Sequence, residues 1–411
     1  MRVGGREVLQ CLSGNPSREN FIEVSRIFER APETLLRWLD QSGLALYLAN
    51  RVQQHGLEGS LSPELEAELV IRLRANRVRT RGMLGEFARV VRGLETRSIQ
   101  YCVLKGFTLY PEFCAEPWLR HQSDLDILVD SASIPVARVA LGELGYLSAG
   151  QEPSGELRFE IPPARVACAE DFLYKADWHR QVEIHVKFYE SVNGVTLRPN
   201  ENWCGAVERR VVGQISYPSL NLSHRIVTQL LHAFRHILHG WVRVGWLYEI
   251  SRILPLLHDE SGWRKADDVL GCDVRTREAC GVVVALTNRA FQQELPYLVE
   301  KRWVQPLRPA LKDWVKRYGM EWLLSDFPGS RLSLLLHREF VDSGWEWQKY
   351  RASRLRRTLG AITISKLSNP NFLARRIASQ ADYFWRYLCW NMQALKGNNR
   401  AEGIFPEKSQ S

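Results

Sequence analysis

Two aspartates, Asp124 and Asp126, lie one residue apart in the apolar run of residues 123–129. Successive side chains of a strand point to opposite faces, so both carboxylates are expected on one face and the apolar side chains on the other. Two like charges this close repel each other unless a cation lies between them. Mg²⁺ or Mn²⁺ is the expected cation, because hard cations prefer oxygen ligands. An acidic strand end exposed to water is the alternative interpretation.

A second expected strand, residues 181–188, carries a third carboxylate. Apolar and polar residues alternate along it, so that Glu183 and His185 share the polar side. If this strand pairs with the aspartate strand, Glu183 joins the first two carboxylates. The alternative is an ordinary half-exposed strand with mixed charges. The side chains expected on its buried face are Val182, Ile184, Val186 and Phe188.

Upstream, a buried strand over residues 98–104 is expected to end at Lys105 and Gly106. Glycine allows the backbone to approach a ligand closely, and lysine meets a phosphate as a point charge. Alternation groups Lys105 with Tyr101 and Val103 on one face, and we expect its ammonium to point into the carboxylate cleft. A structural ion pair with one of the aspartates is the alternative. Together these strands suit metal-assisted phosphoryl or nucleotidyl transfer.

The order and spacing of these motifs resemble the bacterial family of uncharacterised nucleotidyltransferases, in the DNA polymerase β-like superfamily. The resemblance covers roughly residues 60 to 255 and implies a small mixed β-sheet with helices, an α+β fold. The motifs that carry it are Leu104-Lys105-Gly106, Arg120, residues 123–129, Leu144-Gly145-Tyr146, Glu183-Ile184-His185, Leu230-Leu231-His232 and Trp246-Leu247-Tyr248-Glu249-Ile250.

By this resemblance, Asp124, Asp126 and Glu183 are the expected ligands of two Mg²⁺ or Mn²⁺ ions. The implied reaction moves a nucleoside monophosphate from an NTP to an acceptor hydroxyl and releases pyrophosphate, and Glu183 would help to deprotonate that hydroxyl. The acceptor is left open: a small molecule, a protein or a nucleic-acid end. The residues expected to contact the nucleotide or its ions are Lys105, Gly106, Arg120, Ser123 and His185.

The chain also departs from the superfamily pattern. Gly-Ser or Gly-Gly usually precedes the first aspartate, whereas Gly106-Phe107 offers no hydroxyl here and the gap to Asp124 is longer. Glutamate replaces the commoner aspartate at position 183. A second function therefore stays open, in which the chain binds nucleotide as an inactive, regulatory member.

Three regions and a tail are expected along the chain: a helical region over residues 1–97, the nucleotidyltransferase-like core over 98–218, a helical domain over 219–396 and a disordered tail over 397–411. Ser17 and Ser223 are the expected N-caps of helices. Between the acidic strands we expect a helix over 135–144 and a loop or hairpin over 148–165. The later helices are expected at 224–258, 273–292, 300–318, 345–359 and 370–395.

The composition is that of a folded soluble protein, with 45% hydrophobic and 25% charged residues among 411. No apolar signal region begins the chain, and no apolar run approaches the ~18 residues of a spanning helix. Eight cysteines are scattered without a Cys-x-x-Cys pair. A reduced, cytoplasmic protein with structural thiols is therefore expected, without disulfides or zinc.

The net charge of +9 favours anionic partners. The densest basic stretch, residues 349–357, spreads its charges around a helix axis, which indicates a solvated helix more than a membrane-surface helix. Contact with nucleic acid or with acidic lipid is the alternative for this stretch and is not favoured.

Three histidines, His232, His236 and His239, share one face of an expected helix. Packing or hydrogen bonding is the favoured interpretation, with a substrate role and zinc binding as alternatives, because no glutamate completes a His-Glu-x-x-His arrangement. Trp241, Arg243, Trp246 and Tyr248 follow, and interdomain packing is expected of them in preference to base stacking. Arg243 has the reach to contact an anionic ligand.

Overall fold

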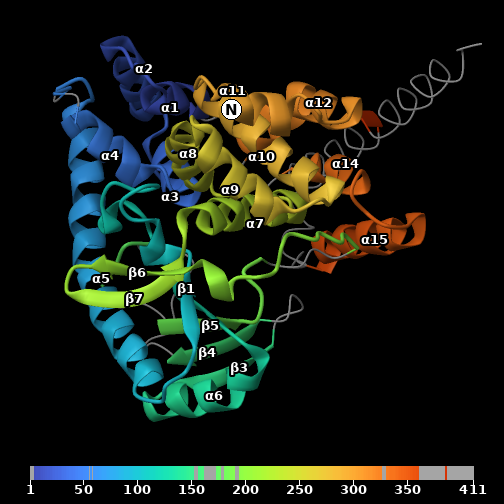
Figure 1. Cartoon of the computed structure of the whole chain (residues 1–411). Coiled ribbons are helices and arrows are strands. Elements are labelled where there is room, and N and C mark those ends of the chain that lie inside the picture. The colour runs from blue at the N-terminus through green and yellow to red at the C-terminus, as the bar shows by residue number, and fades with distance from the viewer. Residues whose placement is uncertain are drawn as a thin grey trace, which may run out of the picture.

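A computed structural model describes residues 4–54, 56–57, 59–151, 156–161, 173–176, 180–189, 194–325, 330–360 and 385–386. The described chain has an α+β fold, as the sequence predicted, with the β-sheet in one half and a helical assembly in the other (Figure 1). Its strands all fall between residues 101 and 220, inside or within two residues of the expected core. The division of the chain into the expected domains stays a prediction.

The sheet has seven strands in the order β3-β4-β5-β2-β1-β7-β6. Strands β2 and β5, which carry the carboxylates, are parallel neighbours, and β1 runs antiparallel to β2 on its other side. The centre of the sheet therefore brings the three expected motif strands together. The strands are β1 (Tyr101–Leu104), β2 (Asp124–Val129), β3 (Leu147–Gln151), β4 (Leu157–Ile161), β5 (Arg180–His185), β6 (Val207–Val212) and β7 (Ile215–Leu220).

One face of the sheet packs against two helices, α5 (Pro63–Glu95) and α6 (Ile134–Glu143). Helix α5 begins at Pro63 with Ser62 as its N-cap and extends along the side of the molecule down to the sheet (Figure 1). Burial of apolar area on this face fixes which strand residues point inward. The cluster includes Phe87, Val90, Val103, Leu125, Ile127, Val182 and Ile184.

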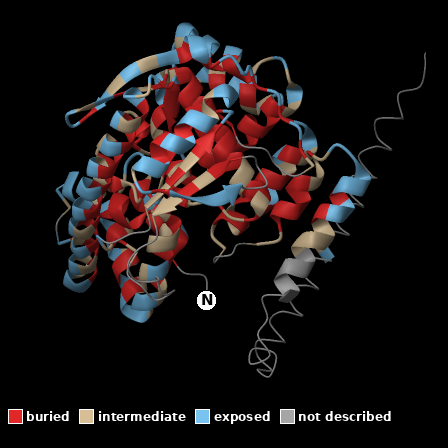
Figure 2. Ribbon diagram, turned by 90° about the horizontal axis from the view of Figure 1, so that it is seen from below, coloured by how far each residue is buried: buried red, intermediate tan, exposed pale blue. Residues whose placement is uncertain are grey.

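The opposite face of the sheet is turned toward α7 (Leu222–His239) and α8 (Val244–Ile253). Leu104 and Leu128 belong to the same buried cluster as residues of these helices. Side chains alternate along β2, so Asp124 and Asp126 lie on the face of Leu128. The carboxylates thus face the helical half. Seen from the sheet side, the interior of the molecule is mostly buried and its rim is mostly exposed (Figure 2).

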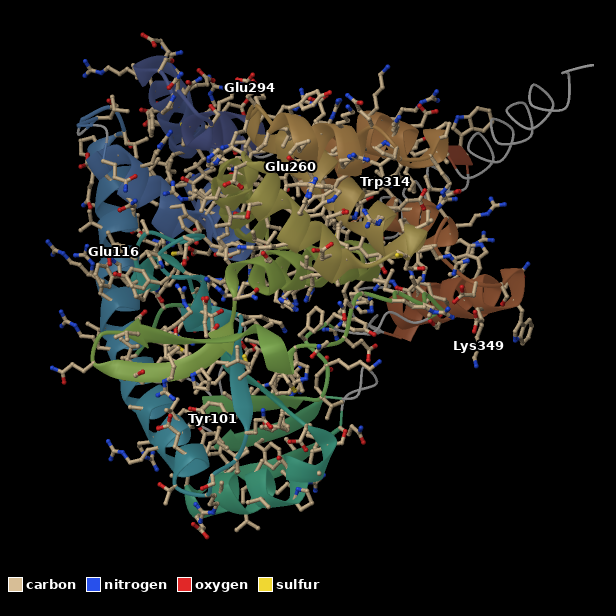
Figure 3. All side chains as sticks on the ribbon, viewed as in Figure 1. Tyr101, Glu116, Glu260, Glu294, Trp314 and Lys349 are labelled. Atoms are coloured by element: carbon tan, nitrogen blue, oxygen red, sulfur yellow. The ribbon has the colours of Figure 1, made fainter. Side chains whose placement is uncertain are left out.

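The N-terminal helices pack into the same hydrophobic cluster as the C-terminal ones. Trp314, which has no exposed surface, lies in this helical half, whereas Tyr101 lies in the sheet (Figure 3). The remaining helices are α1 (Gly5–Leu12), α2 (Arg18–Arg30), α3 (Pro32–Ser42), α4 (Ala45–Gln54), α9 (Glu260–Leu270), α10 (Val274–Phe291), α11 (Tyr297–Val299), α12 (Pro309–Trp314), α13 (Met320–Leu323), α14 (Ser333–Arg338) and α15 (Gly344–Gly360).

Several expected helix boundaries are confirmed and others were wrong. Ser17 caps α2 with a capping box, and α6, α10 and α15 match their predicted spans within two residues. The helix expected over 224–258 is broken, because Gly240 adopts a left-handed conformation with φ 99° and ends α7. Asn221, and not Ser223, caps α7 by accepting a hydrogen bond from the His224 amide.

The span 300–318 is also interrupted, with π-helical segments at Glu300–Val304 and Val315–Gly319 on either side of α12. The expected strand over 181–188 ends at His185, so Val186 is exposed instead of buried. Residues 148–165 form the hairpin of β3 and β4 where they are described. The helix predicted over 370–395, apart from residues 385–386, and the tail predicted over 397–411 lie outside the described residues.

The basic stretch lies on α15, whose apolar side is packed. Trp347 and Tyr350 are buried, and the Tyr350 hydroxyl donates a hydrogen bond to the Leu238 carbonyl. Lys349 is exposed on this helix (Figure 3). Within the described residues, no helix combines the length and the apolar character needed to cross a membrane.

Candidate active site

The carboxylates of the two parallel strands meet at the centre of the sheet. The register of β2 and β5 pairs Asp126 directly with Glu183. One ligand atom from each of Asp126, Glu183 and His185 lies within 4.8 Å of the others. The predicted approach of Glu183 to an aspartate is therefore confirmed, while its role as a metal ligand stays a prediction.

Asp126 is the best-partnered carboxylate of the group. Its Oδ1 lies 3.1 Å from Lys105 Nζ and 2.8 Å from His185 Nε2. An ionised carboxylate only accepts, so both groups donate to it. Burial alone would raise the pKa of Asp126, but the Lys105 ammonium and the His185 hydrogen bond outweigh it and hold that pKa well below its usual range. His185 thus orients the carboxylate instead of lining the cleft.

Lys105 reaches Asp126 by leaving the strand. Strand β1 ends at Leu104, and Lys105 has φ 48°, a left-handed conformation. Tyr101 and Val103 point into the core under α5, on the face away from the carboxylates. Lys105 therefore reaches the carboxylate cleft, as predicted, but through this turn of the backbone and not through strand alternation. The structural ion pair is present, and the phosphate-binding role stays a prediction.

The charges of the other two carboxylates are less fully compensated. Burial and then the charge of Asp126 raise the pKa of Asp124, whose Oδ2 accepts a hydrogen bond of 3.2 Å from the Ser123 hydroxyl. Burial, followed by the charges of Asp126 and Asp124, raises the pKa of Glu183 to about 7. The Gln181 amide donates to Glu183 at 2.7 Å. These two groups favour a proton or a cation beside them.

This donor set fits a divalent cation. It combines three carboxylates, whose negative charges are only partly compensated, with the His185 imidazole, which fixes the orientation of the Asp126 carboxylate. Among the described residues, Asp126, Glu183 and His185 form the one group with metal-ligand geometry. The histidines of α7 do not form such a group: the rings of His232 and His236 are 4.6 Å apart, and that of His239 lies 6.5 Å from His236.

A cavity of about 300 Å³ opens over the carboxylates, between the sheet and the loop that joins α7 to α8. It brings together six of the residues proposed from sequence: Lys105, Arg120, Ser123, Asp124, Asp126 and Glu183. Gly106 and His185 do not line it. The lining residues that the sequence argument had not assigned to the site are His121, Gln122, Glu156, Arg158, His232, Arg235, His236, Trp241, Arg243 and Trp246.

Two arginines of the cavity are held by fixed partners. Both carboxylate oxygens of Glu249 accept from Arg120 Nε, at 3.0 and 3.3 Å, and Tyr47 donates to Glu249 at 2.6 Å. Burial acts to lower the pKa of Arg120, but Glu249 outweighs it and raises that pKa. Arg243 donates to the backbone carbonyl of His121 at 3.3 Å. Both guanidinium groups are thus fixed charges at the cavity wall.

The wall on the α7 and α8 side is aromatic. Trp241 and Trp246 line the cavity, and the Trp246 ring lies 4.6 Å from His232 and 4.7 Å from His236. Burial lowers the pKa of both histidines well below the usual value, so they are neutral. The tryptophans were expected to serve interdomain packing, but they also line the cavity. Tyr248 does pack in the core, where its ring lies 4.8 Å from that of Tyr47.

Phe107 takes the place of the serine or glycine that is usual in the superfamily, but its side chain does not obstruct the cavity. Phe107 points into the core on the other face of the sheet, where its ring lies 5.2 Å from that of Phe87. Gly106 has φ 47°, and a Cβ atom there would lie 2.8 Å from Gln122 Oε1. The positive φ favours glycine here, whereas the contact with the end of the Gln122 side chain could be relieved by movement of that side chain.

Glu156 and Arg158 are site residues that the sequence argument missed. Arg158 pairs in register with Glu183 across β4 and β5, and its Nε lies 3.7 Å from the Glu183 carboxylate. The alternation of Glu156, Arg158 and Glu160 with Leu157 and Phe159 was the available signal, because period two predicts a strand with one polar face. Because residues 148–165 were expected to form a loop or hairpin, this polar face was not recognised.

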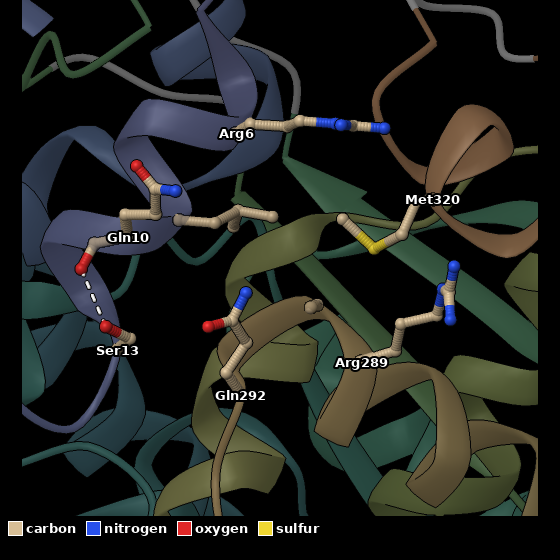
Figure 4. A pocket seen from close by; sticks show the side chains of 8 residues that line it. Arg6, Gln10, Ser13, Arg289, Gln292 and Met320 are labelled. Atoms are coloured by element: carbon tan, nitrogen blue, oxygen red, sulfur yellow. Dashed lines mark hydrogen bonds between the residues drawn. The ribbon is translucent and has the colours of Figure 1, made fainter. Parts of the chain in front are cut away.

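A larger cavity of about 460 Å³ lies elsewhere, between α1, α10 and α13 (Figure 4). Arg6, Arg289, Gln10 and Gln292 surround it, and none of its described lining residues is acidic. It therefore has no ligand set for a hard cation. Size does not identify the candidate active site here; the carboxylates do.

Residues 29–290 match a protein family described as uncharacterised nucleotidyltransferase. The chain belongs to this family. The matched span begins in α2 and ends in α10, so the nucleotidyltransferase match contains the whole sheet, both carboxylate strands and every residue that lines the cavity. It extends further in both directions than the motifs of the resemblance. A comparison with curated proteins finds no match.

Proposed function

We propose that this family member is a metal-dependent nucleotidyltransferase, which moves a nucleoside monophosphate from an NTP to an acceptor hydroxyl. The observation that carries the proposal is the direct pairing of Asp126 with Glu183 under a cavity that Lys105 and Arg120 also line. Carboxylates for a cation and fixed positive charges for phosphates are the two requirements of phosphoryl-group transfer.

Asp124, Asp126 and Glu183 would hold Mg²⁺ or Mn²⁺, which supplies neutralisation of the phosphate charge and a lower pKa for the attacking hydroxyl. Around that centre, Lys105 and Arg120 bind phosphate oxygens. Arg243 lines the same cavity and binds the part of the triphosphate that leaves as pyrophosphate. These cations replace the hydroxyl that the Gly106-Phe107 turn lacks.

In the transfer step, the acceptor oxygen forms a bond to the α-phosphorus while the bond from that phosphorus to the bridging oxygen of the β-phosphate breaks. The electron pair of the broken bond leaves with pyrophosphate. The proton of the acceptor hydroxyl goes to a carboxylate oxygen of Glu183, which acts as the general base.

One alternative has a specific observation in its favour. The ion pair between Lys105 and Asp126 neutralises part of the site without any nucleotide, which is compatible with an inactive, nucleotide-binding member. Magnesium-dependent nucleotide binding without release of pyrophosphate would support that alternative against the proposal.

The test incubates the purified protein with each α-labelled NTP, Mg²⁺ and a cell extract, and measures pyrophosphate release and label transfer to an acceptor. Asp126→Asn is expected to reduce both by about a hundredfold or more. Asp130→Asn is the matched control at the other end of β2, where Asp130 caps a short 3₁₀ helix and asparagine caps equally well. Equal activity of the two variants would refute the proposal.

A further inference from the structure

The cavity is divided into chemically different parts. Asp126, Glu183 and Glu156 form a carboxylate end, while Arg120 and Arg243 form fixed positive charges. On the α7 and α8 side the cavity is lined by two indoles and two imidazoles, those of Trp241, Trp246, His232 and His236, and by the guanidinium group of Arg235. Metal and phosphate binding, which the proposed function requires, uses the first two parts and leaves the aromatic wall without a role.

We infer that Trp241 and Trp246, with His232 and His236, form a binding subsite for the aromatic base of the nucleotide. The inference rests on the proposed function and deepens it, because it adds recognition of a nucleobase to recognition of the triphosphate. Flat aromatic bases stack on indole rings, and an imidazole ring nitrogen donates to or accepts from the polar edge of a base.

Connectivity supports this assignment. Trp241 lies just beyond Gly240, whose left-handed conformation ends α7, and Trp246 lies in the first turn of α8. The break at Gly240 thus turns the chain so that both indoles line one cavity. A continuous helix, as the sequence had suggested, would carry the two residues around its axis instead.

The charge state of the wall suits a base better than a phosphate. His232 and His236 are buried next to each other and to Trp246, and burial keeps both imidazoles neutral near pH 7. Neutral rings add no attraction for an anion, whereas they provide hydrogen-bonding nitrogens and apolar ring faces. The phosphates are therefore expected at the arginines, and the base at the aromatic wall.

The position of the wall relative to the cations sets the orientation of the ligand. The charges of Lys105 and Arg120 act on the pKa of His232, and so do those of Asp126 and Asp124, so this end of the aromatic wall lies near both the phosphate-binding and the metal-binding side chains. The parts of a nucleotide follow the same order as these two parts of the cavity, because its sugar joins the base on one side to the phosphates on the other. The cavity of about 300 Å³ accommodates these parts side by side.

Binding measured with two probes separates the subsites. The probes are inorganic tripolyphosphate, which has no base, and the four NTPs, each with Mg²⁺. The best NTP is expected to bind the wild-type protein at least about tenfold more tightly than tripolyphosphate, although it has fewer negative charges. This comparison needs no variant and decides the inference even if a variant fails to fold.

Two variants then test whether the tryptophans form the base subsite. Trp241→Ala and Trp246→Ala are each expected to weaken NTP binding by about five- to a hundredfold and to leave tripolyphosphate binding within about twofold. The unchanged tripolyphosphate affinity also shows that each variant is folded. Trp345→Ala is the matched control, because Trp345 is 76% exposed on α15 and outside the cavity; it should change neither affinity.

Each outcome decides one question. Equal affinity of the wild-type protein for tripolyphosphate and for every NTP would refute the base subsite and leave the proposed phosphate chemistry standing. Tryptophan variants that lose both ligands equally would refute the assignment of these residues. Absence of magnesium-dependent binding of either probe would refute the proposed function, and the inference with it.

Discussion

Asp126 and Glu183 lie opposite each other on two parallel strands, β2 and β5, although 56 residues separate them in the chain. A one-residue shift of this register would turn one of the two carboxylates to the other face of the sheet. The shift is prevented because Ile127 and Ile184, their neighbours, are both buried under α5. Hydrophobic packing on one face therefore fixes the acidic cluster on the other.

The first prediction concerns the cation. Asp124→Asn and Asp126→Asn should each abolish tight Mg²⁺ or Mn²⁺ binding and preserve the fold, because both side chains share the strand face that meets Glu183. Titration calorimetry measures the affinity, and circular dichroism checks the fold. Asp130→Asn is again the control and should bind metal as the wild type does. Unchanged metal affinity in both site variants would rule out the proposed ligand set.

The second prediction concerns pH and Glu183. Burial and the neighbouring aspartates raise its folded-state pKa from 4.5 to about 7. Because the folded-state pKa is raised, protonation of Glu183 stabilises the folded, metal-free protein. This stabilisation is fully present below pH 4.5, the unfolded-state pKa, and is lost as the pH rises to about 7. A cation competes with that proton, so metal affinity should rise over the same interval.

Calorimetric titration with Mg²⁺ between about pH 5 and pH 8 tests this second prediction. Glu183→Gln cannot lose a proton and should show weaker binding with much less dependence on pH. A wild-type affinity that stays constant across this interval would contradict the raised pKa.

The sequence predicted the strands better than the places where they stop. Period-two alternation located Asp126 and Glu183 correctly, because one face of each strand is buried and that pattern is local. It put Lys105 in the cleft for the wrong reason, since β1 ends at Leu104 and the backbone of Lys105 turns to φ 48°. Alternation carries no information about where the ladder of hydrogen bonds ends, and neighbouring strands decide that.

The aromatic wall was the harder part to predict. The sequence marked Trp241 and Trp246 as members of a helical stretch, where indoles at such positions usually pack in a core. The break at Gly240 places both beside the cavity, and a glycine inside a helical pattern is compatible with either continuation or termination. The contact between Arg120 and Glu249 joins residues 129 positions apart, which no local pattern reports.

The third prediction concerns the ion pair of Lys105. Its ammonium lies 3.1 Å from Asp126 and both side chains are buried. Lys105→Ala removes the ammonium partner of the buried Asp126 carboxylate and leaves it only the hydrogen bond from His185, so the free energy of unfolding without metal should fall by about 3–5 kcal/mol, with partial recovery on adding Mg²⁺. Thermal or urea unfolding with and without Mg²⁺ measures this.

The surface provides a matched control for that variant. Lys187 pairs with Glu201 at 2.8 Å, but both side chains are about half exposed, so Lys187→Ala should change stability by less than about 1 kcal/mol and should not respond to Mg²⁺. If Lys105→Ala also weakens tripolyphosphate binding, Lys105 contacts phosphate as proposed. Unchanged affinity for both tripolyphosphate and NTPs would eliminate the phosphate role and leave only the ion pair.

The fourth prediction concerns Glu249, a positioning residue. It lies behind Arg120 with 1% of its surface exposed, and both of its oxygens accept from Arg120 Nε. Glu249→Gln preserves the shape but removes the charge that orients the guanidinium, so tripolyphosphate affinity should fall about tenfold, in line with the loss of a charge-assisted hydrogen bond. Tyr47→Phe removes the second partner of Glu249 and should have a smaller effect in the same direction.

Glu278→Gln distinguishes positioning from general loss of stability. Glu278 is also a buried glutamate paired with an arginine, at 2.7 Å from Arg308 Nε, but it lies on α10 and does not line the cavity. Both glutamine variants should lower the melting temperature, whereas only Glu249→Gln should weaken tripolyphosphate binding. If the two variants weaken binding equally, Glu249 acts through the stability of the fold; if only Glu249→Gln does, its carboxylate holds Arg120 in the orientation that meets phosphate.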